Sequence, residues 1–274
     1  MQYAGGTQMT VMEISKYIEY VSAEGDRFAD AAEQGDLDVA IEPCGDWDMR
    51  ALVRHLGLIH LWAAGHVAFP TDDFLDADDI PDMARYWPEL GAAWPSDDEL
   101  VPWYRKTKAN LVRVLAEAPD HHECFSFLPA PTPVTMWSRR QASEIAIHRF
   151  DAEDARGIAS DFEPAFAADM LDELLSGFAA GPRATEGRID LGGTKVLHVH
   201  ATDVDEHWRL TIEDDEIVTT RDDGPADLTI CGSASDLYLA MWNRADDSNL
   251  TLEGDPALLD YWREASRVRW SGGE

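Results

Sequence analysis

The hydrophobic pattern of this chain changes its period once, and that change constrains the fold more than any other feature. Up to about residue 180, apolar residues recur at the three- and four-residue spacing of amphipathic helices. Beyond residue 187 they alternate, or run over short lengths, between clusters of glycine and aspartate. Helices followed by strands predict an all-α domain and then a smaller α+β domain.

The first half of the sequence predicts four long helices. Asp46 or Asp48 can cap the second helix, and Ser96-Asp97-Asp98-Glu99 has the form of a capping box before the third. Gly157 can end the fourth. Helices joined in this way predict an up-and-down bundle. The expected spans are residues 12–32, about 46–67, about 96–118 and about 134–155.

The second half predicts strands and short helices after a fifth helix over residues 162–180, which Gly181-Pro182 would close. The expected strands are residues 188–191, 196–202, 208–213, 217–220 and 228–231, and the helices that follow are about 234–243 and 256–266. We therefore expect a helical bundle over residues 1–158, a linking helix within residues 159–186, and an α+β domain over residues 187–274.

The composition is strongly acidic, with 53 acidic against 22 basic residues and a formal net charge of −31. A field of that sign repels phosphate backbones, so we expect no nucleic-acid partner. No apolar run is long enough for a membrane span, and the first ten residues do not have the pattern of a signal peptide, so we expect a cytoplasmic protein. The three cysteines are far apart and indicate free thiols.

The residues with the clearest chemical pattern are Glu144, His148 and His55. Glu144 and His148 are four apart on one predicted helix and therefore project from the same face. His55 lies mid-helix among apolar residues. A carboxylate and two imidazoles can hold a divalent metal and leave positions open for catalysis. By spacing alone, a solvated ion pair and a core histidine remain alternatives.

Neighbouring residues could support such a site. Asp151, three residues after His148, can accept the second imidazole N–H. Arg139, Arg140 and Arg149 could hold a carboxylate near the metal, or could pair with surface acids.

The other histidines favour other roles. His60 and His66 share the helix of His55 but are expected to pack or to lie at the surface. His198 and His200 alternate on one predicted strand, without an evident third ligand, and His207 is expected in a loop.

The residues around these candidates resemble a known family. The segment from Trp137 to Asp151, which contains Arg139-Arg140, Glu144 and His148, resembles the signature helix of the mycothiol-dependent maleylpyruvate isomerase family, a branch of the DinB-like metalloenzymes. Residues 47–56, which contain His55, resemble the helix that carries its first histidine ligand. Trp242-Asn243-Arg244 and residues 254–259 supply a third match, so the resemblance spans nearly the whole chain.

This resemblance implies a DinB-like four-helix bundle that binds one divalent metal, usually zinc, through His55, Glu144 and His148, followed by a domain similar to sterol-carrier proteins. It also implies mycothiol, a low-molecular-weight thiol, as cosubstrate. The resemblance implies Arg244 as a catalytic residue. From their positions near Glu144, we expect Arg140 as a second catalytic residue and Arg139 and Trp137 in cofactor binding. Many relatives have histidine where this chain has Ser143, which could alter the surroundings of the metal.

The implied activity is cis–trans isomerisation of a maleylpyruvate-like substrate, or S-transfer of the thiol to a small, anionic electrophile. The alternative is a non-catalytic metal-binding or partner-binding module, with acidic residues 72–82 in the long loop at 70–96 as its interaction surface. We expect a monomer or a small homo-oligomer.

Overall fold

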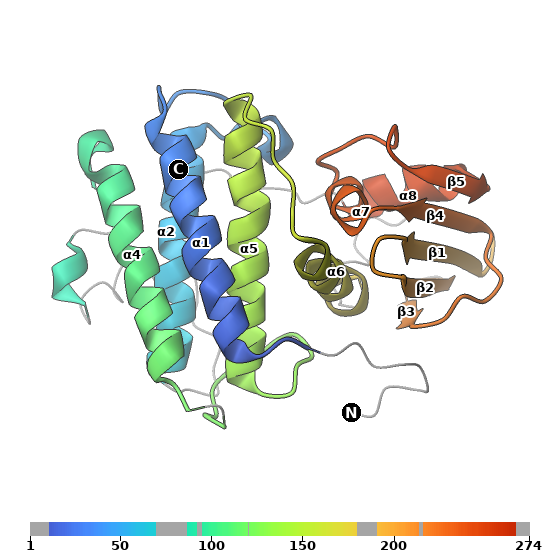
Figure 1. The fold of residues 1–274 in the computed structure, drawn as a ribbon, viewed down its shortest axis with the longest axis horizontal. Helices are drawn as coiled ribbons and strands as arrows, with labels where there is room; N and C mark the ends of the chain where they lie inside the picture. The colour runs from blue at the N-terminus through green and yellow to red at the C-terminus, as the bar shows by residue number, and fades with distance from the viewer. Residues whose placement is uncertain are drawn as a thin grey trace. The chain divides into compact units, whose positions relative to one another are not determined.

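The structure is a computed structural model that describes residues 11–69, 87–91, 95–119, 121–179, 191–213 and 216–266. The chain divides into two compact units between Ser160 and Asp161. The first is helical and the second combines helices with a sheet (Figure 1). The predicted order of an all-α part followed by an α+β part is therefore confirmed.

Among the described residues of the helical unit, four long helices pack side by side (Figure 1). Helix α1 contacts α4 and α5, and α2 contacts the same two helices. The four helices lie close to the spans expected from the sequence. They are α1 (Ile14–Glu33), α2 (Met49–Ala68), α4 (Asp97–Glu117) and α5 (Pro133–Ala155), and two 3₁₀ turns accompany them, η1 (Glu42–Cys44) and η4 (Pro88–Leu90).

Local side-chain chemistry explains where these helices begin and end. Asp48 caps α2, because its carboxylate accepts a hydrogen bond of 2.8 Å from the backbone N–H of Ala51. Gly157 follows α5 with a φ of 67°, the left-handed conformation that glycine adopts without steric cost. The capping box predicted at Ser96 is wrong in detail. Its hydroxyl donates to the carboxylate of Glu99 instead of accepting from the backbone.

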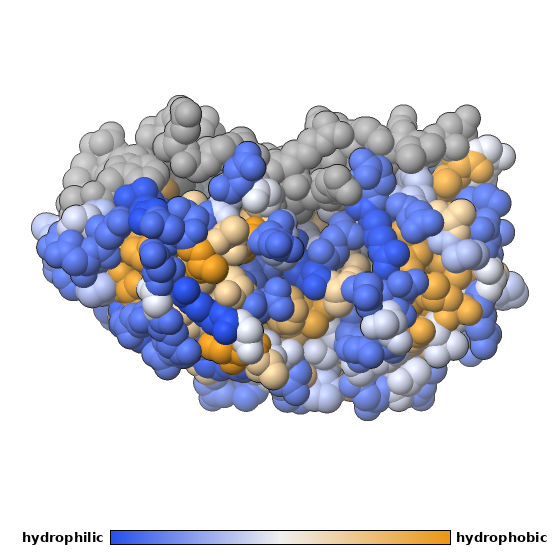
Figure 2. Space-filling view, turned by 90° about the horizontal axis from the view of Figure 1, so that it is seen from above, coloured by the Kyte–Doolittle hydropathy of each residue, from blue (hydrophilic) through white to orange (hydrophobic). Residues whose placement is uncertain are grey.

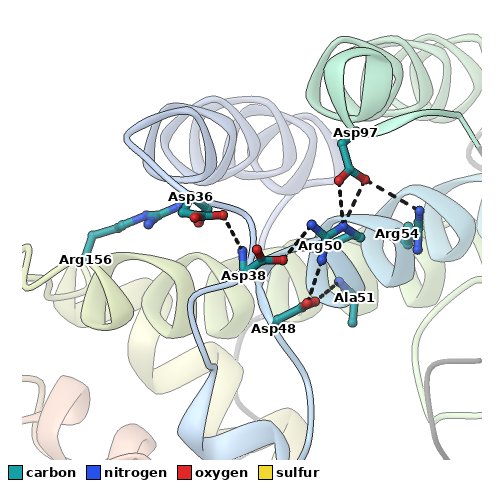
Figure 3. Close-up of polar contacts among 8 residues, drawn as sticks. All are labelled: Asp36, Asp38, Asp48, Arg50, Ala51, Arg54, Asp97 and Arg156. Carbon is teal, nitrogen blue, oxygen red and sulfur yellow. Dashed lines mark hydrogen bonds and ion pairs between the residues drawn. The ribbon is translucent and has the colours of Figure 1, made fainter.

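Arg50 joins three segments at the beginning of α2 (Figure 3). Its guanidinium contacts the carboxylates of Asp38, Asp48 and Asp97 at distances of 2.7, 2.8 and 2.9 Å. A cation at a helix N-terminus opposes the helix dipole, and the three acids offset that cost. This cluster fixes the start of α2, and therefore of the helix that carries His55, against the start of α4 and the loop before α2.

Buried ion pairs connect α1 to α5. Arg149 is completely buried, and its guanidinium donates to Glu24 of α1 at 2.7 Å and to Glu153 of α5 at 2.8 Å. Arg27 of α1 also donates to Glu153, at 3.0 Å. The sequence left open whether Arg149 holds a carboxylate near the metal or pairs with acids at the helix surface. In the structure its side chain is buried and faces α1, because it lies one residue beyond His148 on the helix.

The α+β unit contains a five-stranded mixed sheet in the order β3-β2-β1-β4-β5. Strands β1 and β4 are parallel, and the other neighbouring pairs are antiparallel. Apolar residues alternate along β1 and β2, so one face of these strands forms the core of the unit. The strands are β1 (Lys195–Ala201), β2 (Glu206–Glu213), β3 (Glu216–Thr220), β4 (Leu228–Gly232) and β5 (Thr251–Gly254).

Helices precede and follow the strands in the sequence of this unit. Helix α6 (Pro164–Asp172) contacts α7 (Ala234–Met241), and α8 (Ala257–Ala265) follows β5. The fifth helix expected from the sequence widens after α6 into a π-helical turn, η5 (Glu173–Phe178). The indole N–H of Trp208 donates to Asp172 at 2.9 Å. This part of the expected linking segment therefore packs on the sheet.

Strand β5 was missing from the sequence prediction. It has four residues, of which only Leu252 is apolar, so it lacks the alternating pattern by which the other strands are recognised. It forms because its backbone pairs with β4. The predicted residues 188–190, the turn Gly181-Pro182 and the acidic loop residues 72–82 lie outside the described part of the chain.

None of the described helices is long and apolar enough to cross a membrane. On the face drawn in Figure 2, hydrophilic side chains predominate, with smaller apolar areas between them.

We predict that Arg149→Ala lowers the free energy of unfolding by about 3–5 kcal/mol, because Glu24 stays buried after losing this guanidinium, while Glu153 keeps Arg27. Arg113→Ala is the matched control, because Arg113 and Glu117 have the same four-residue spacing but are exposed. Arg113→Ala should lower the free energy of unfolding by less than about 1 kcal/mol. Urea unfolding followed by circular dichroism measures both, and equal losses would contradict the prediction.

Candidate metal centre

Three candidate ligands from two helices meet inside the helical unit. His55 projects from the middle of α2, and Glu144 and His148 project one turn apart from α5. The Nε2 atom of His55 lies 3.0 Å from Oε1 of Glu144, and Nε2 of His148 lies 3.4 Å from the same oxygen. The three ligand atoms all lie within 4.8 Å of one another.

The donor set and its spacing fit a divalent metal. Two imidazole nitrogens and one carboxylate oxygen are a ligand set of catalytic zinc sites, which keep a further position open. Ligands about 2 Å from a tetrahedral ion are about 3.3 Å apart. The two contacts of Glu144 lie close to that spacing, so one ion could replace them without a large movement of either helix. The assignment of these residues as metal ligands remains a prediction.

Asp151 orients His148. Its buried carboxylate lies 2.8 Å from Nδ1 of His148, so it accepts the proton of that nitrogen and leaves Nε2 directed at Glu144. The same Asp151 oxygen accepts from the thiol of Cys44, at 3.5 Å. The sequence indicated Asp151 but not Cys44, which no local spacing connects to the site. The loop before α2 brings it there.

Arg140 lies one turn before Glu144 and forms an ion pair with its second carboxylate oxygen. Burial alone would raise the pKa of Glu144, but the charge of Arg140 and hydrogen bonds with His148 and His55 lower it well below its ordinary value. Glu144 is therefore an anion at neutral pH. A carboxylate in that state is the form that binds metal.

The two imidazoles differ in protonation. Burial lowers the pKa of His55, and hydrogen bonding to Glu144 does not fully offset it. Burial would also lower the pKa of His148, but hydrogen bonds to Asp151, Cys44 and Glu144 raise it well above its ordinary value. Without a metal, His148 therefore holds a proton that ligation has to displace.

The other histidines of α2 lie away from this cluster. His60 is completely buried, its Nδ1 lies 3.2 Å from the hydroxyl of Thr107, and burial lowers its pKa to about 3. His66 stacks on the ring of Trp137 at 4.8 Å, and burial lowers its pKa to about 4. Both side chains are buried in the helical unit, which is the packing role among the two alternatives, packing or surface, that the sequence left open.

The structure locates the remaining predicted site residues but does not test their roles. Trp137 is completely buried, and its indole donates to the carbonyl of Phe125 at 2.7 Å. Arg139 is also buried on α5. Arg244 belongs to the α+β unit, where its guanidinium donates to the carbonyl of Trp242 at 2.9 Å.

Ser143 takes a role within its own helix. Its hydroxyl donates to the carbonyl of Arg139 at 3.1 Å, and the side chain is buried. Serine within a helix commonly forms a hydrogen bond of this kind, to the carbonyl four residues earlier.

Two protein-family models match this chain. The family model of the mycothiol maleylpyruvate isomerase N-terminal domain matches residues 19–153. The model of the MDMPI C-terminal domain matches residues 165–261. No curated protein matches the chain by sequence.

Two solved structures of the mycothiol-dependent maleylpyruvate isomerase are similar in fold. One, a histidine-to-alanine mutant, is 11% identical with a TM-score of 0.62, and the match covers 89% of this chain and 96% of that one. The other is 12% identical with a TM-score of 0.60 and the same coverage.

We predict that Asp151→Asn weakens zinc binding by about 10–100-fold, because the amide can no longer hold His148 as the carboxylate does. Asp154→Asn, an exposed residue on the same helix, is the control and should leave the affinity unchanged. Competition with a fluorescent chelator measures both. Equal affinities of the two variants would argue against this role for Asp151.

Zinc binding at His55, Glu144 and His148 should release about one proton at pH 7, from His148, since Glu144 is already ionised and His55 already neutral. Affinity should therefore rise with pH, by about tenfold per unit, until the raised pKa of His148 is passed. Calorimetry in two buffers of different ionisation enthalpy counts the protons. A binding enthalpy independent of the buffer would contradict the expectation.

Proposed function

The chain belongs to the mycothiol maleylpyruvate isomerase family, since the two family models together cover most of it, and we propose that it is a metal-dependent isomerase that uses mycothiol. The observation that supports this most directly is the convergence of His55, Glu144 and His148. A chain that kept the fold without the chemistry would not need these three side chains at one point. The comparisons favour an enzyme over the non-catalytic alternative.

The finer features of the fold follow from the same family. We infer that α1, α2, α4 and α5 form a DinB-like four-helix bundle and that the α+β unit is a sterol-carrier-like domain. We also infer a cytoplasmic protein, either a monomer or a small homo-oligomer, with zinc as the native metal. Zinc suits a site of two imidazoles and one carboxylate.

A divalent metal bound there would supply positive charge that lowers the pKa of a thiol and so provides thiolate at neutral pH. The residues of this chain would supply the ligands and hold them in the required protonation states. His55 presents a neutral nitrogen, and His148 does so once its second proton is displaced, while Asp151 keeps the other proton on the nitrogen that faces away from Glu144. Glu144 contributes the anion, whose second oxygen Arg140 balances.

The proposed reaction conserves atoms and electrons. The thiolate of mycothiol adds to one carbon of a cis double bond conjugated to a carbonyl, and the electron pair of that bond moves onto the carbonyl oxygen. Rotation about the new single bond follows. The electrons then return, the C–S bond breaks, and the same thiolate leaves the trans product. An S-transferase would instead protonate and retain the adduct.

The charges near the triad suit an anionic substrate. The net charge of −31 disfavours anions over the molecule as a whole, whereas α5 carries two buried cations just before Glu144, with Arg140 one turn away and Arg139 five residues away. Arginine binds carboxylates through paired N–H groups. We propose that Arg140 helps to hold a substrate carboxylate, with Arg244 as a second catalytic residue. Arg139 and Trp137 are proposed for the thiol.

The test uses zinc-loaded, full-length protein with maleylpyruvate, with and without mycothiol, and follows the trans product by chromatography. Isomerisation should require the thiol. His55→Ala and His148→Ala should each lower it by at least about a hundredfold, because loss of a ligand exceeds the effect of losing an outer partner. The control His121→Ala removes an exposed histidine and should retain activity.

Two results would contradict parts of the proposal. Full activity of His148→Ala would remove the metal site from the mechanism. Conjugation of mycothiol to a test electrophile, without isomerisation of maleylpyruvate, would establish an S-transferase in place of an isomerase.

A further inference from the structure

A second cluster of histidines lies on the sheet of the α+β unit. His198 and His200 are two apart on β1, and His207 is on β2, directly opposite His200 in the antiparallel register. Residues two apart share a face of a sheet, so all three imidazoles lie on the side opposite the buried Val199 and Trp208. The rings of His200 and His207 are 4.0 Å apart and nearly parallel, with 12° between their planes.

A carboxylate completes the cluster. The turn between β1 and β2 ends at Asp205, whose φ of 56° is a left-handed conformation that aspartate tolerates better than most residues. Its Oδ1 lies 3.3 Å from Nε2 of His200 and 3.6 Å from Nε2 of His207. These three ligand atoms lie within 4.8 Å of one another. The turn therefore supplies the third ligand that the sequence had not revealed.

His198 controls which nitrogen of His207 is available. Its Nε2 lies 3.0 Å from Nδ1 of His207, so one of these two nitrogens must carry the proton that joins them. A proton on Nδ1 of His207 leaves Nε2 of that ring free to ligate. His198 then carries its own proton on Nδ1, which lies 3.4 Å from the hydroxyl of Thr229. This chain of contacts resembles the outer partners that orient histidine ligands in metal sites.

We propose that the β1–β2 hairpin binds a second divalent transition-metal ion, of the zinc class, through Nε2 of His200, Nε2 of His207 and the carboxylate of Asp205, with His198 as positioning residue. Imidazole suits zinc, copper and nickel better than calcium or magnesium. The side chains of His200 and His207 are 24% and 27% exposed, which gives an ion access from solvent. The acidic chain as a whole attracts cations.

The test is zinc binding by the metal-free, full-length protein, measured by equilibrium dialysis and elemental analysis. His207→Ala and Asp205→Asn should each bind one zinc equivalent fewer than the wild type. Asparagine accepts the left-handed backbone of residue 205, so the second variant should fold normally even if the first does not. His121→Ala and Asp260→Asn are controls that remove an exposed histidine and an exposed acid outside the cluster, and both should bind as the wild type does.

His198→Gln separates positioning from ligation. It should keep the site but weaken it by about 10–100-fold, because His207 loses the partner that fixes its proton. The site is also distinct from the candidate centre on α2 and α5. His148→Ala should therefore leave the equivalent that depends on His207 in place. If His207→Ala and Asp205→Asn bind as much zinc as the wild type, the proposal is wrong.

Discussion

Buried charge on α5 is the constraint on which the helical unit depends. This helix carries ionisable residues on two sides, and most of them are buried. A buried ion without a partner lowers the stability of the fold by several kcal/mol, so the neighbouring helices must carry polar or charged partners opposite each buried ion. Helix α1 supplies Glu24 and Arg27 to the side that carries Arg149. Helix α2 supplies His55 to the side that carries Glu144. The interactions that set the packing of α1 and α2 against α5 therefore also assemble the candidate metal centre.

Sequence patterns predicted the parts of this arrangement that depend on neighbours in the chain. Helical periodicity gave the long helices, and Asp48 and Gly157 marked two of their ends. Spacing placed Glu144 beside His148, and the family resemblance selected His55 as their partner. What spacing could not give is burial. Arg149–Glu153 and Arg113–Glu117 have the same four-residue separation, yet one pair is buried and the other exposed.

The residues that sequence reasoning missed depend on segments that meet only in the fold. Cys44 reaches Asp151 across 107 residues, and β5 is a strand because β4 pairs with it. His207 was expected in a loop, because the hairpin register that sets it opposite His200 is not visible in either strand alone. The two histidine–carboxylate clusters also differ in burial. In the one on α2 and α5 His148 is buried, whereas in the one on the hairpin Asp205 is exposed.

The ion pairs between α1 and α5 also bear on how the chain is made. Glu24 and Arg149 are 125 residues apart, so a ribosome adding about 5–20 residues per second completes α5 roughly 6–25 s after α1. During that interval α1 has no access to α5, and Glu24 lacks Arg149. Helix α4 leaves the exit tunnel earlier, so its contacts with α1 and α2 can form first. The packing of α5, and with it the candidate metal centre, is completed only when this last long helix has left the tunnel.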